Sequence, residues 1–521
     1  MKLVINNLHL SPDKEINYLK KIVLDKYQIP IQTFTLLRKS LDARKKNKIF
    51  YNCKILINLD SKKAKELLLE KDVSEYTPPS NYPLPNIKKK ISPLIIGTGP
   101  AGLFCALRLS EAGLKTKLFE QGKIIEERQQ DVDLLKKNGL LNEESNVLFG
   151  EGGAGTFSDG KIYSRVKNSK EEWLFKQFVK FGAPLEILYE AKPHLGTDRL
   201  KKIIKNIRTH LKNKGTEFYF QEKVTDLLLD QQKILGIKTS QNKEYQSSLI
   251  ILATGHSARD IYQLLKDKNI VLEKKGFAVG IRVEHPKNFI DKSQYGSSPF
   301  KKILPPAEYF LNHKNKKTNR STYSFCMCPG GEIINASSEN NLLNTNGMSF
   351  SKRDSFFSNA AIVVTVSPLD LGNDPLAGID FQKKLEGKAF KAGKGNFKAP
   401  VQTVNSFLKE KIDSTLPKIS FKPGGWPADY NSFLPTWLAE ELKAGFLSFE
   451  KKIKNFSFGP GVLVGLETRT SSPVRILRND SFQAINLPGL FPIGEGAGYS
   501  GGIISSALDG LRAADYIINS N

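Results

Sequence analysis

The sequence predicts an α/β protein: a parallel sheet with its helices, a β-rich second part and a small α+β unit at the N-terminus. Strand-length apolar runs alternate with helical apolar spacing through much of the first half of the chain, as in βαβ units. Three runs of small residues lie at 97–102, 149–161 and 489–503. After residue 276, short β-like runs alternate with long polar loops, which is typical of a sheet-rich domain.

The first glycine run lies between a predicted strand, 91–96, and a helix predicted over 101–112. Gly97 permits a tight turn, Gly99 lets the backbone approach a pyrophosphate, and Gly102 lets the helix pack close to the sheet. Free N–H groups at the helix start favour phosphate. Glu120 ends the next predicted strand, where a carboxylate can accept both ribose hydroxyls and disfavours a 2′-phosphate. These features favour a Rossmann-like dinucleotide-binding domain over a strand-turn-helix without a ligand.

The other two glycine runs lie far apart in the sequence. Residues 149–161 read Phe-Gly-Glu-Gly-Gly-Ala-Gly-Thr-Phe-Ser-Asp-Gly-Lys, which suits a loop whose backbone lies against a ligand, although a flexible surface loop is the alternative. Residues 489–503 run from an apolar strand through a glycine turn into a last helix, predicted over 504–518. The sequence therefore predicts three backbone segments that face one long ligand.

The chain resembles the FAD-dependent oxidoreductases of the glutathione-reductase type. Within them it is most similar to an uncharacterised group of bacterial and plastid FAD-dependent dehydrogenases. The residues that carry the resemblance are 97–102 with Glu120, 150–160, 251–256, 323–331, 466–475 and 494–502. The resemblance implies a non-covalently bound FAD. It also implies a Rossmann-like FAD-binding domain with a β-rich substrate or cap domain.

The implied contacts are specific. Glu120 would bind the adenosine ribose, the Val224 backbone would contact the adenine, and Glu495 stands where many relatives carry a ribityl-binding aspartate. A helix start near Gly498 would face the flavin ring with its positive end. The implied cofactor-binding residues are Gly97, Gly99, Pro100, Ala101, Gly102, Glu120, Gln121, Gly152, Gly153, Ala154, Gly155, Thr156, Ser158, Asp159, Val224, Ala253, Thr254, Gly255, Gly494, Glu495, Gly496, Gly498, Gly501, Gly502 and Ile503.

Composition indicates the cellular compartment of the protein. None of the apolar runs among the 521 residues approaches the ~18 needed to span a bilayer, and residues 1–10 lack the apolar core of a secretory signal. The four cysteines make no disulfide scaffold. We therefore expect a cytoplasmic protein that does not associate with a membrane. No metal-ligand spacing occurs, so no metal is expected.

The formal net charge is +25. A solvated, lysine-rich surface is the favoured interpretation, because the excess is spread along the chain. A nucleic-acid partner is the alternative, since basic surfaces bind phosphates. Residues 38–48 form a local basic block, which we predict to lie in a loop or turn.

The predicted domains follow from shifts in pattern. Residues 1–76 read β-α-β-β-α, with strands at 2–5, 32–38 and 49–58 and helices at 13–26 and 61–71, which suggests a ferredoxin-like α+β domain. Proline-rich residues 77–92 form a linker. Residues 93–275 begin the FAD-binding domain, with a parallel sheet and a small antiparallel meander. Residues 276–485 form the substrate or cap domain, and 486–521 return to the FAD-binding domain.

Two cysteines are the first candidates for chemistry beyond the cofactor. Cys326 and Cys328 would be thiols near the flavin, or else two small apolar side chains buried on one face of a strand. The chain has no second glycine pattern after a strand and no Cys-x-x-Cys. It therefore lacks the features of a disulfide reductase, and NADH or NADPH, if either is the electron donor, would bind without a dedicated module.

Charged residues near the last flavin strand are the second candidates. Glu467, Arg469 and Arg475 lie among hydroxyl residues and suit an anion or substrate clamp near the flavin ring. A salt-bridge network is the equal alternative. Arg282 and His285 could join the clamp.

The sequence thus predicts a flavoenzyme that transfers a hydride or electrons between a donor and a small-molecule substrate through FAD. Two other functions stay open. One is an RNA-modifying flavoprotein, suggested by the charge. The other is a non-catalytic FAD-binding assembly protein, suggested by the lack of an obvious catalytic acid, base or dithiol.

Overall fold

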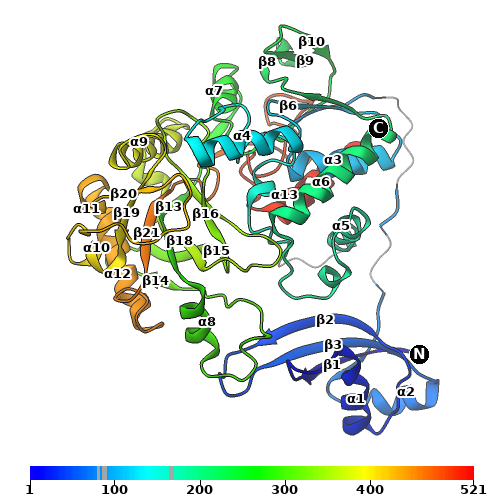
Figure 1. Ribbon diagram of the computed structural model, residues 1–521. Helices are drawn as coiled ribbons and strands as arrows, with labels where there is room; N and C mark the ends of the chain where they lie inside the picture. Colours follow the sequence, from blue (N-terminus) through cyan, green and yellow to red (C-terminus); the bar gives the residue numbers. More distant parts are fainter. Residues whose placement is uncertain (79–81, 85–90, 164–168, 521) are drawn as a thin grey trace. The chain divides into compact units, whose positions relative to one another are not determined.

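The computed structural model describes residues 1–78, 82–84, 91–163 and 169–520 (Figure 1). Contacts divide the chain into two compact units. Unit 1 comprises residues 1–82, 161–194 and 287–308, and unit 2 comprises 83–160, 195–286 and 309–521. The domain boundaries expected from the sequence stay predictions, and most of the expected linker at 77–92 lies outside the described residues.

Unit 1 is built on a four-stranded antiparallel sheet of order β2-β3-β1-β4. One face of the sheet forms an apolar core with α1 and α2. The sheet contributes Leu3 and Ile55, and the helices contribute Val23 and Leu67. Its elements are β1 (Lys2–Leu10), η1 (Ile16–Tyr18), α1 (Leu19–Tyr27), β2 (Thr35–Asp42), β3 (Phe50–Asn58), α2 (Ser61–Leu67) and β4 (Val73–Glu75). The element order is therefore β-α-β-β-α-β.

Two later excursions of the chain also belong to unit 1. They contain α5 (Ser169–Lys180) with η3 (Leu185–Leu188), and α8 (Lys287–Tyr295). The first excursion reaches the edge of β2, where the Lys39 N–H donates to the Tyr189 carbonyl at 2.7 Å and the Ala191 N–H donates to the Lys39 carbonyl at 2.9 Å. These bonds satisfy part of a sheet edge that would otherwise be open.

The structure corrects the sequence-based prediction in several parts of unit 1. The basic block at 38–48 is not all loop, because residues 38–42 lie in β2. The helix expected at 13–26 begins only at Leu19, after a 3-10 turn. Strand β4, which the pattern did not predict, adds to the β1 edge and is only three residues long.

Unit 2 contains a five-stranded parallel sheet of order β23-β11-β5-β6-β7. All residues of β5, β11 and β23 are buried, as expected for strands that are covered on both faces. The strands are β5 (Leu94–Ile96), β6 (Lys117–Glu120), β7 (Glu217–Phe220), β11 (Ile250–Leu252) and β23 (Leu490–Pro492). A three-stranded antiparallel meander follows β7 and contains β8 (Val224–Asp230), β9 (Lys233–Thr239) and β10 (Glu244–Gln246). The predicted parallel sheet with a meander is confirmed.

Helices accompany this sheet. They are α3 (Pro100–Glu111), α4 (Ile125–Asn138), α6 (Gly196–Asn213), α7 (Arg259–Asp267) and α13 (Ile503–Ser520). Proline at the first position suits the start of α3, and Gly113, with φ +84°, follows its end. Helices α3 and α13 pack side by side (Figure 1), and the buried Arg108 of α3 donates to Asp515 of α13 at 3.0 Å. The last helix thus returns to the first glycine turn.

The remainder of unit 2 is built on a seven-stranded sheet of order β14-β15-β18-β13-β21-β19-β20, in which every pair except β19–β20 is antiparallel. Its strands are β13 (Phe277–Pro286), β14 (Asn312–Lys314), β15 (Ser321–Cys328), β18 (Phe357–Val366), β19 (Ala399–Thr403), β20 (Gly425–Pro427) and β21 (Val462–Glu467). Two-stranded ladders pair β12 (Leu272–Lys274) with β22 (Val474–Ile476), and β16 (Glu332–Asn335) with β17 (Thr345–Met348). The prediction of a sheet-rich C-terminal part is confirmed.

The helices of this part are α9 (Ala377–Ala392), α10 (Val404–Leu408), α11 (Tyr430–Phe433) and α12 (Thr436–Glu450), and the short 3-10 helices of unit 2 are η2 (Ala154–Phe157) and η4 (Pro368–Asp370). Among the described residues, every helix is too short or too polar to cross a bilayer.

A buried carboxyl lies in the middle of the second sheet. Glu284 of β13 is fully buried and accepts the Ser420 N–H at 2.8 Å and the Ser420 hydroxyl. Burial disfavours the charged form and raises the pKa of Glu284 from the usual 4.5 to about 7, although the two hydrogen bonds oppose this rise. Between pH 4.5 and about 7, the carboxyl therefore stays protonated in the folded protein, whereas it ionises in the unfolded chain.

We predict a pH-dependent contribution of Glu284 to stability. The contribution is complete below pH 4.5 and is lost as the pH rises to about 7, because the unfolded chain gives up its proton first. Over that range the difference in unfolding free energy between wild type and Glu284→Gln should change by up to about 1.4 kcal/mol per pH unit. Urea unfolding at several pH values measures it, with Glu440→Gln on the exposed side of α12 as control. Parallel profiles of wild type and Glu284→Gln would contradict it.

Candidate functional site

The carboxyl ends of four parallel strands carry the residues that the sequence analysis singled out. Strand β5 is followed by Gly97, β6 ends at Glu120, β11 is followed by Ala253, and β23 is followed closely by Gly494. Because the strands are parallel, these ends lie along one edge of the sheet. The chain leaves β5 in one direction, toward β6, and later returns on the other side as β11 and β23. Such a switch point is where open α/β sheets bind ligands.

The three glycine segments meet at this edge, as the sequence analysis expected. The Gly152 N–H donates to the Thr98 carbonyl at 3.0 Å. A Cβ on Gly153 would lie 2.9 Å from the Cα of Gly99, and one on Gly155 would lie 3.0 Å from the Ile503 side chain. Backbone from residues 98–99 and from 152–153 therefore lies in direct contact, and the Ile503 side chain at the start of α13 packs beside Gly155.

Two glycines of the first turn are required by their surroundings. Gly97 has φ +102°, and a Cβ there would lie 2.4 Å from the carbonyl oxygen of Ala253. A Cβ on Gly102 would lie 2.1 Å from the Gly97 carbonyl oxygen. The first turn is thus closed against β11 and α3, as the Gly-x-Gly-x-x-Gly pattern predicts.

Other glycines border open space. A Cβ on Gly99 would meet only the Cα of Gly153, at 3.9 Å, and one on Gly255, Gly501 or Gly502 would meet nothing within 4 Å. Two of these glycines immediately precede α13, which starts at Ile503. That is one residue before the helix predicted over 504–518 and five residues after the start near Gly498 that the resemblance implied. The main chain therefore lines a cradle next to the N-termini of α3 and α13, whose dipoles favour negative charge. This backbone suits a pyrophosphate-containing ligand.

Glu120 holds the cradle together. One carboxylate oxygen accepts the Thr98 N–H at 3.0 Å and the Thr98 hydroxyl at 2.8 Å. The other accepts the Gly122 N–H at 3.1 Å and the Gly150 N–H at 3.0 Å. This buried carboxylate joins the first glycine turn to the second glycine run. Its predicted contact with a ribose stays a prediction.

The second glycine run is held by a buried arginine that the sequence analysis did not identify. Arg128 of α4 donates to the carbonyls of Asn146, Val147, Gly150 and Glu151 at 2.6–3.2 Å. Burial lowers the pKa of Arg128 to about 10, against the opposing effect of nearby carboxylates. Since the guanidinium makes four hydrogen bonds to main-chain oxygens, the loop has a defined shape.

Further contacts hold the end of the same run. Asp159, predicted to bind the cofactor, forms a buried ion pair with Arg353 and accepts the Ser349 hydroxyl. The Ser158 hydroxyl donates to the Gly155 carbonyl at 2.7 Å. These side chains therefore hold the end of the second glycine run in place through hydrogen bonds and an ion pair. Arg353 itself has φ +50°, which is unusual for a residue with a side chain.

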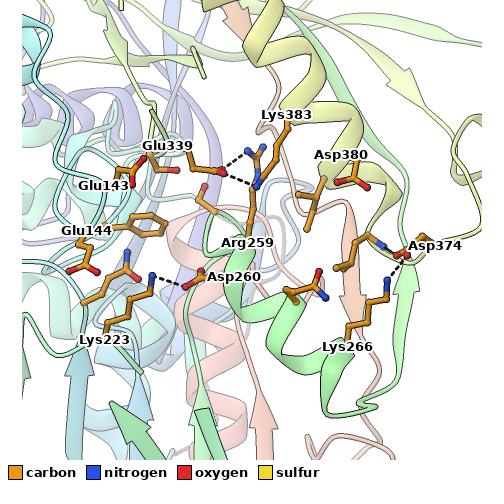
Figure 2. Close-up of a pocket in the computed structure, with 17 residues that line it drawn as sticks. Glu143, Glu144, Lys223, Arg259, Asp260, Lys266, Glu339, Asp374, Asp380 and Lys383 are labelled. Carbon is orange, nitrogen blue, oxygen red and sulfur yellow. Dashed lines mark hydrogen bonds and ion pairs between the residues drawn. The ribbon is translucent and has the colours of Figure 1, made fainter. Parts of the chain in front are cut away.

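A cavity of about 410 Å³ opens beside the end of β6 (Figure 2). Gln121 and Phe149 line it on the side of the glycine runs, and charged residues of α7 and α9 line it on the other. Its charges are largely paired: Lys223 contacts Asp260 at 2.8 Å, and Lys383 contacts Glu339 at 2.7 Å. The cavity adjoins the place where the sequence analysis put the adenosine.

A buried network lies behind this cavity. The carboxylate of Glu386, fully buried on α9, accepts from Arg259 of α7 at 2.8–2.9 Å and from Arg469 at 3.0 Å. The two guanidinium groups hold the pKa of Glu386 well below its usual range, in spite of burial. Arg469 also donates to the Ser338 hydroxyl at 2.6 Å. Arg469 therefore serves in a salt-bridge network that joins α7, α9 and the segment after β21.

The other clamp candidates have separate partners. Arg282 of β13 is fully buried and forms an ion pair with Glu467, and it donates to the Cys326 carbonyl at 3.0 Å. Arg475 contacts Glu273 at 3.2 Å. Each arginine is thus paired with a different carboxylate, and the structure does not assemble them into one anion clamp.

His285 is a buried scaffold residue. Its Nε2 lies 2.8 Å from the Phe456 carbonyl, and its ring packs on the Phe456 ring at 4.5 Å. Burial lowers the pKa of His285 to about 4, so the imidazole is neutral at neutral pH.

The two cysteines do not share the environment that a regular strand would give them. A register shift between Phe325 and Cys328 interrupts the alternation of β15, and Cys326 has φ +43°. Cys328 is buried, whereas Cys326 is half-buried. The interpretation of two side chains buried on one strand face is therefore wrong. All four cysteines lie in the described part of the chain, and none of them forms a disulfide.

Three ionisable residues gather near the start of α13. His256 Nε2 lies 3.7 Å from Glu495 Oε1. Burial raises the pKa of Glu495 to about 7, with Lys275 opposing the rise. Burial and the nearby Arg469, Arg259 and Lys275 lower the pKa of His256 to about 3. His256 is therefore neutral, and Glu495 changes its protonation near neutral pH.

Comparison with known proteins identifies the class of ligand. Residues 276–470 match a family described as "FAD-dependent protein, C-terminal domain-like", and residues 92–261 match "pyridine nucleotide-disulphide oxidoreductase". Residues 1–58 match a domain of unknown function. A protein of Clostridium beijerinckii (strain ATCC 51743 / NCIMB 8052), described as "Uncharacterized protein", is 42% identical over 529 residues, which cover 99% of each chain.

Solved structures are less similar. The flavin-dependent brominase Bmp2 is 13% identical, covers 83% of this chain and 80% of its own, and gives a TM-score of 0.37. The L-proline dehydrogenase from P. horikoshii is 14% identical, covers 84% of this chain and 95% of its own, and gives 0.35. CtdE in complex with FAD is 9% identical, covers 82% and 84%, and gives 0.32.

FAD is the cofactor of this chain, as its C-terminal family match states. The residues present suit it: bare backbone borders open space at Gly99, Gly501 and Gly502, and two helix N-termini face the same edge. Which of the predicted residues touch the cofactor stays a prediction.

We predict that Glu120→Gln weakens FAD binding roughly 10- to 100-fold. The glutamine NH₂ group would replace an acceptor that now receives two hydrogen bonds, so buried N–H groups would lose their partners. Flavin fluorescence titration of the purified protein measures the change. Glu127→Gln, an exposed position on α4, is the matched control and should bind FAD as wild type does. Unchanged affinity in Glu120→Gln would show that this carboxylate does not organise the cradle.

We also predict that Gly97→Ala yields protein with little bound flavin, because the new Cβ would push the turn away from β11. Gly113→Ala is the matched control: Gly113 also has positive φ, at +84°, but no atom within 4 Å of a Cβ. It should cost about 1 kcal/mol of stability and keep its flavin. The ratio of flavin to protein absorbance distinguishes the two. Equal flavin contents would contradict the prediction.

Proposed function

We propose, from the premise that the chain belongs to the same family as the Clostridium beijerinckii protein, that it is an FAD-dependent dehydrogenase of the glutathione-reductase-type superfamily. It would take a hydride from a reduced donor and pass electrons to a second small molecule. The specific group of bacterial and plastid FAD-dependent dehydrogenases is part of this proposal.

The meeting of three glycine segments at the carboxyl ends of parallel strands carries the proposal. Glu120 fixes two of these segments to one another, and the contact of Gly155 with Ile503 adds the third. Bare backbone and helix N-termini suit the pyrophosphate of a dinucleotide. When bound, FAD supplies hydride acceptance and donation, and the protein supplies binding and orientation.

The residues before α13 are the proposed reactive end of the site. Glu495 would hold a proton below about pH 7 and carry a negative charge above it. His256 is neutral, and its Nε2 lies 3.7 Å from that carboxyl, just beyond hydrogen-bond distance. Lys275 supplies a nearby positive charge. The exposed glycines at 501 and 502 leave room for a ring beside these groups.

NADH or NADPH is the proposed donor. Among the described residues, the parallel sheet with β5 is the one sheet of three or more strands in which every pair is parallel. A second parallel sheet would be needed for a separate nicotinamide-binding domain. A nicotinamide donor would therefore bind without a domain of its own, on the open side of the flavin.

The remaining proposals concern the whole protein. The β-α-β-β-α-β order of unit 1 supports a ferredoxin-like arrangement, and the absence of disulfides among the four described cysteines supports a cytoplasmic location.

Anaerobic stopped-flow mixing tests the proposal. We expect NADH or NADPH to bleach the oxidised-flavin absorbance rapidly. The rate should fall as pH rises through about 7, because ionised Glu495 opposes negative charge arriving beside it. In Glu495→Gln this step in the pH profile should be absent, whereas Glu273→Gln, an exposed position on β12, should keep it.

Slow bleaching with every pyridine nucleotide, in protein that dithionite still reduces, would contradict the proposal. That outcome favours the non-catalytic FAD-binding alternative. If wild type and Glu495→Gln give the same pH profile, Glu495 does not act at the reactive end. That result would not contradict the binding of FAD.

A further inference from the structure

Positive charge is concentrated in unit 1. Its residue ranges contain 27 lysines and arginines against 15 aspartates and glutamates, so unit 1 carries +12 of the net charge of +25. Unit 1 comprises 138 of the 521 residues. About half of the excess charge therefore lies on about a quarter of the chain, a concentration that only the tertiary grouping makes apparent.

The charge is densest at β2, β3 and the loop between them. Lys45, Lys46 and Lys48 are exposed, and no ion pair with them occurs among the described residues. Arg44 contacts Asp42 at 2.5 Å. Arg38 of β2 lies directly opposite Lys54 of β3, again without an acidic partner in the described chain. Like charges opposite one another destabilise a sheet, and a bound anion would relieve that cost.

Arg38 and Lys54 lie on the sheet face that is turned away from the helices. Alternation along β3 puts Cys53 and Ile55 in the core with α1 and α2, and puts Lys54 on the other side. Cross-strand pairing places Ser40 and His9 beside Asn52 on that same side. Hydroxyl, amide and cationic groups therefore share one partly exposed face.

The same face carries a stack of rings. The His9 ring lies 4.1 Å from the Phe50 ring, at the end of β3 next to the basic loop. His9 is exposed and Phe50 is half-buried, so one side of the stack faces solvent. A planar aromatic or heterocyclic group could extend it.

We propose that this basic face, defined as His9, Arg38, Ser40, Phe50, Asn52 and Lys54 with the loop lysines 45, 46 and 48, binds single-stranded RNA. The cations contact phosphates, and a base stacks on the His9–Phe50 pair. Asn52 and Ser40 offer hydrogen bonds to a ribose 2′-hydroxyl, the group that distinguishes RNA from DNA.

The chemistry of the face favours RNA over the other anionic partners. A membrane surface is bound best by apolar side chains that enter it beneath basic ones, whereas this face carries amide and hydroxyl groups between its cations. An acidic protein would neutralise the lysines but leave the ring stack unused. Single-stranded nucleic acid supplies both phosphates and stackable bases at short spacing.

Fluorescence anisotropy with the FAD-loaded full-length protein and a short labelled single-stranded RNA tests the inference. Binding should weaken steeply between 50 and 200 mM salt. The double variant Arg38→Gln, Lys54→Gln should reduce the slope of log affinity against log salt by about 1.4, or ~0.7 for each lost phosphate contact. Phe50→Leu should weaken binding roughly tenfold with an unchanged slope, because it removes stacking but no charge.

Lys62→Gln, Lys63→Gln on α2 is the matched control, since it removes the same charge from exposed positions on a helix that packs on the other face of the sheet. Circular dichroism melting checks that each variant folds. Any of four results would overturn the inference: no binding to RNA at 50 mM salt, equal affinity for DNA of the same sequence, equal affinity for vesicles with anionic headgroups, or equal losses in the two double variants. None of these results bears on flavin reduction, so the test is independent of the proposed function.

Discussion

The cofactor cradle depends on the buried carboxylate of Glu120. Its two oxygens accept four hydrogen bonds from Thr98, Gly122 and Gly150, which belong to segments after two different strands and to the second glycine run. Buried N–H groups are costly when they lack acceptors, so one side chain compensates for several irregular backbone segments. The glycine turns can then stay free of side chains on the side that faces a ligand.

Most buried charged residues around this cradle hold loops and neighbouring segments in place. Arg128 shapes the second glycine run, Arg353 holds its end through Asp159, and the Arg259–Glu386–Arg469 network joins the segments behind the cavity. Buried ion pairs add little net stability, but removing one partner leaves an uncompensated charge, so they penalise any other arrangement. Glu495 differs, because its pKa of about 7 lets its charge change under ordinary conditions.

The sequence predicted regular, locally encoded structure well. Strands predicted at 217–220, 224–229 and 234–239 match β7, β8 and β9 within a residue, whereas β10 was not predicted. The pattern also placed α3 and the end of β6 within a residue, because apolar period and glycine position are local signals. It missed α4, since Arg128 and Asp131 occupy its inward face and hide the apolar period. It misjudged residues 38–42, because basic side chains suit an exposed strand as well as a loop. It also misjudged Cys326, because a bulge in β15 is set by the neighbouring strand.

By itself the sequence determined the Gly-x-Gly-x-x-Gly turn, the acid that ends the next strand, and the two later glycine segments, since these depend on backbone freedom at single positions. Only the tertiary structure decided which charges pair, because residues such as Arg259 and Glu386 stand 127 positions apart. It also decided that three separate stretches of chain make up unit 1. Pairing and grouping of this kind follow from packing between distant elements, and no local pattern of residues encodes them.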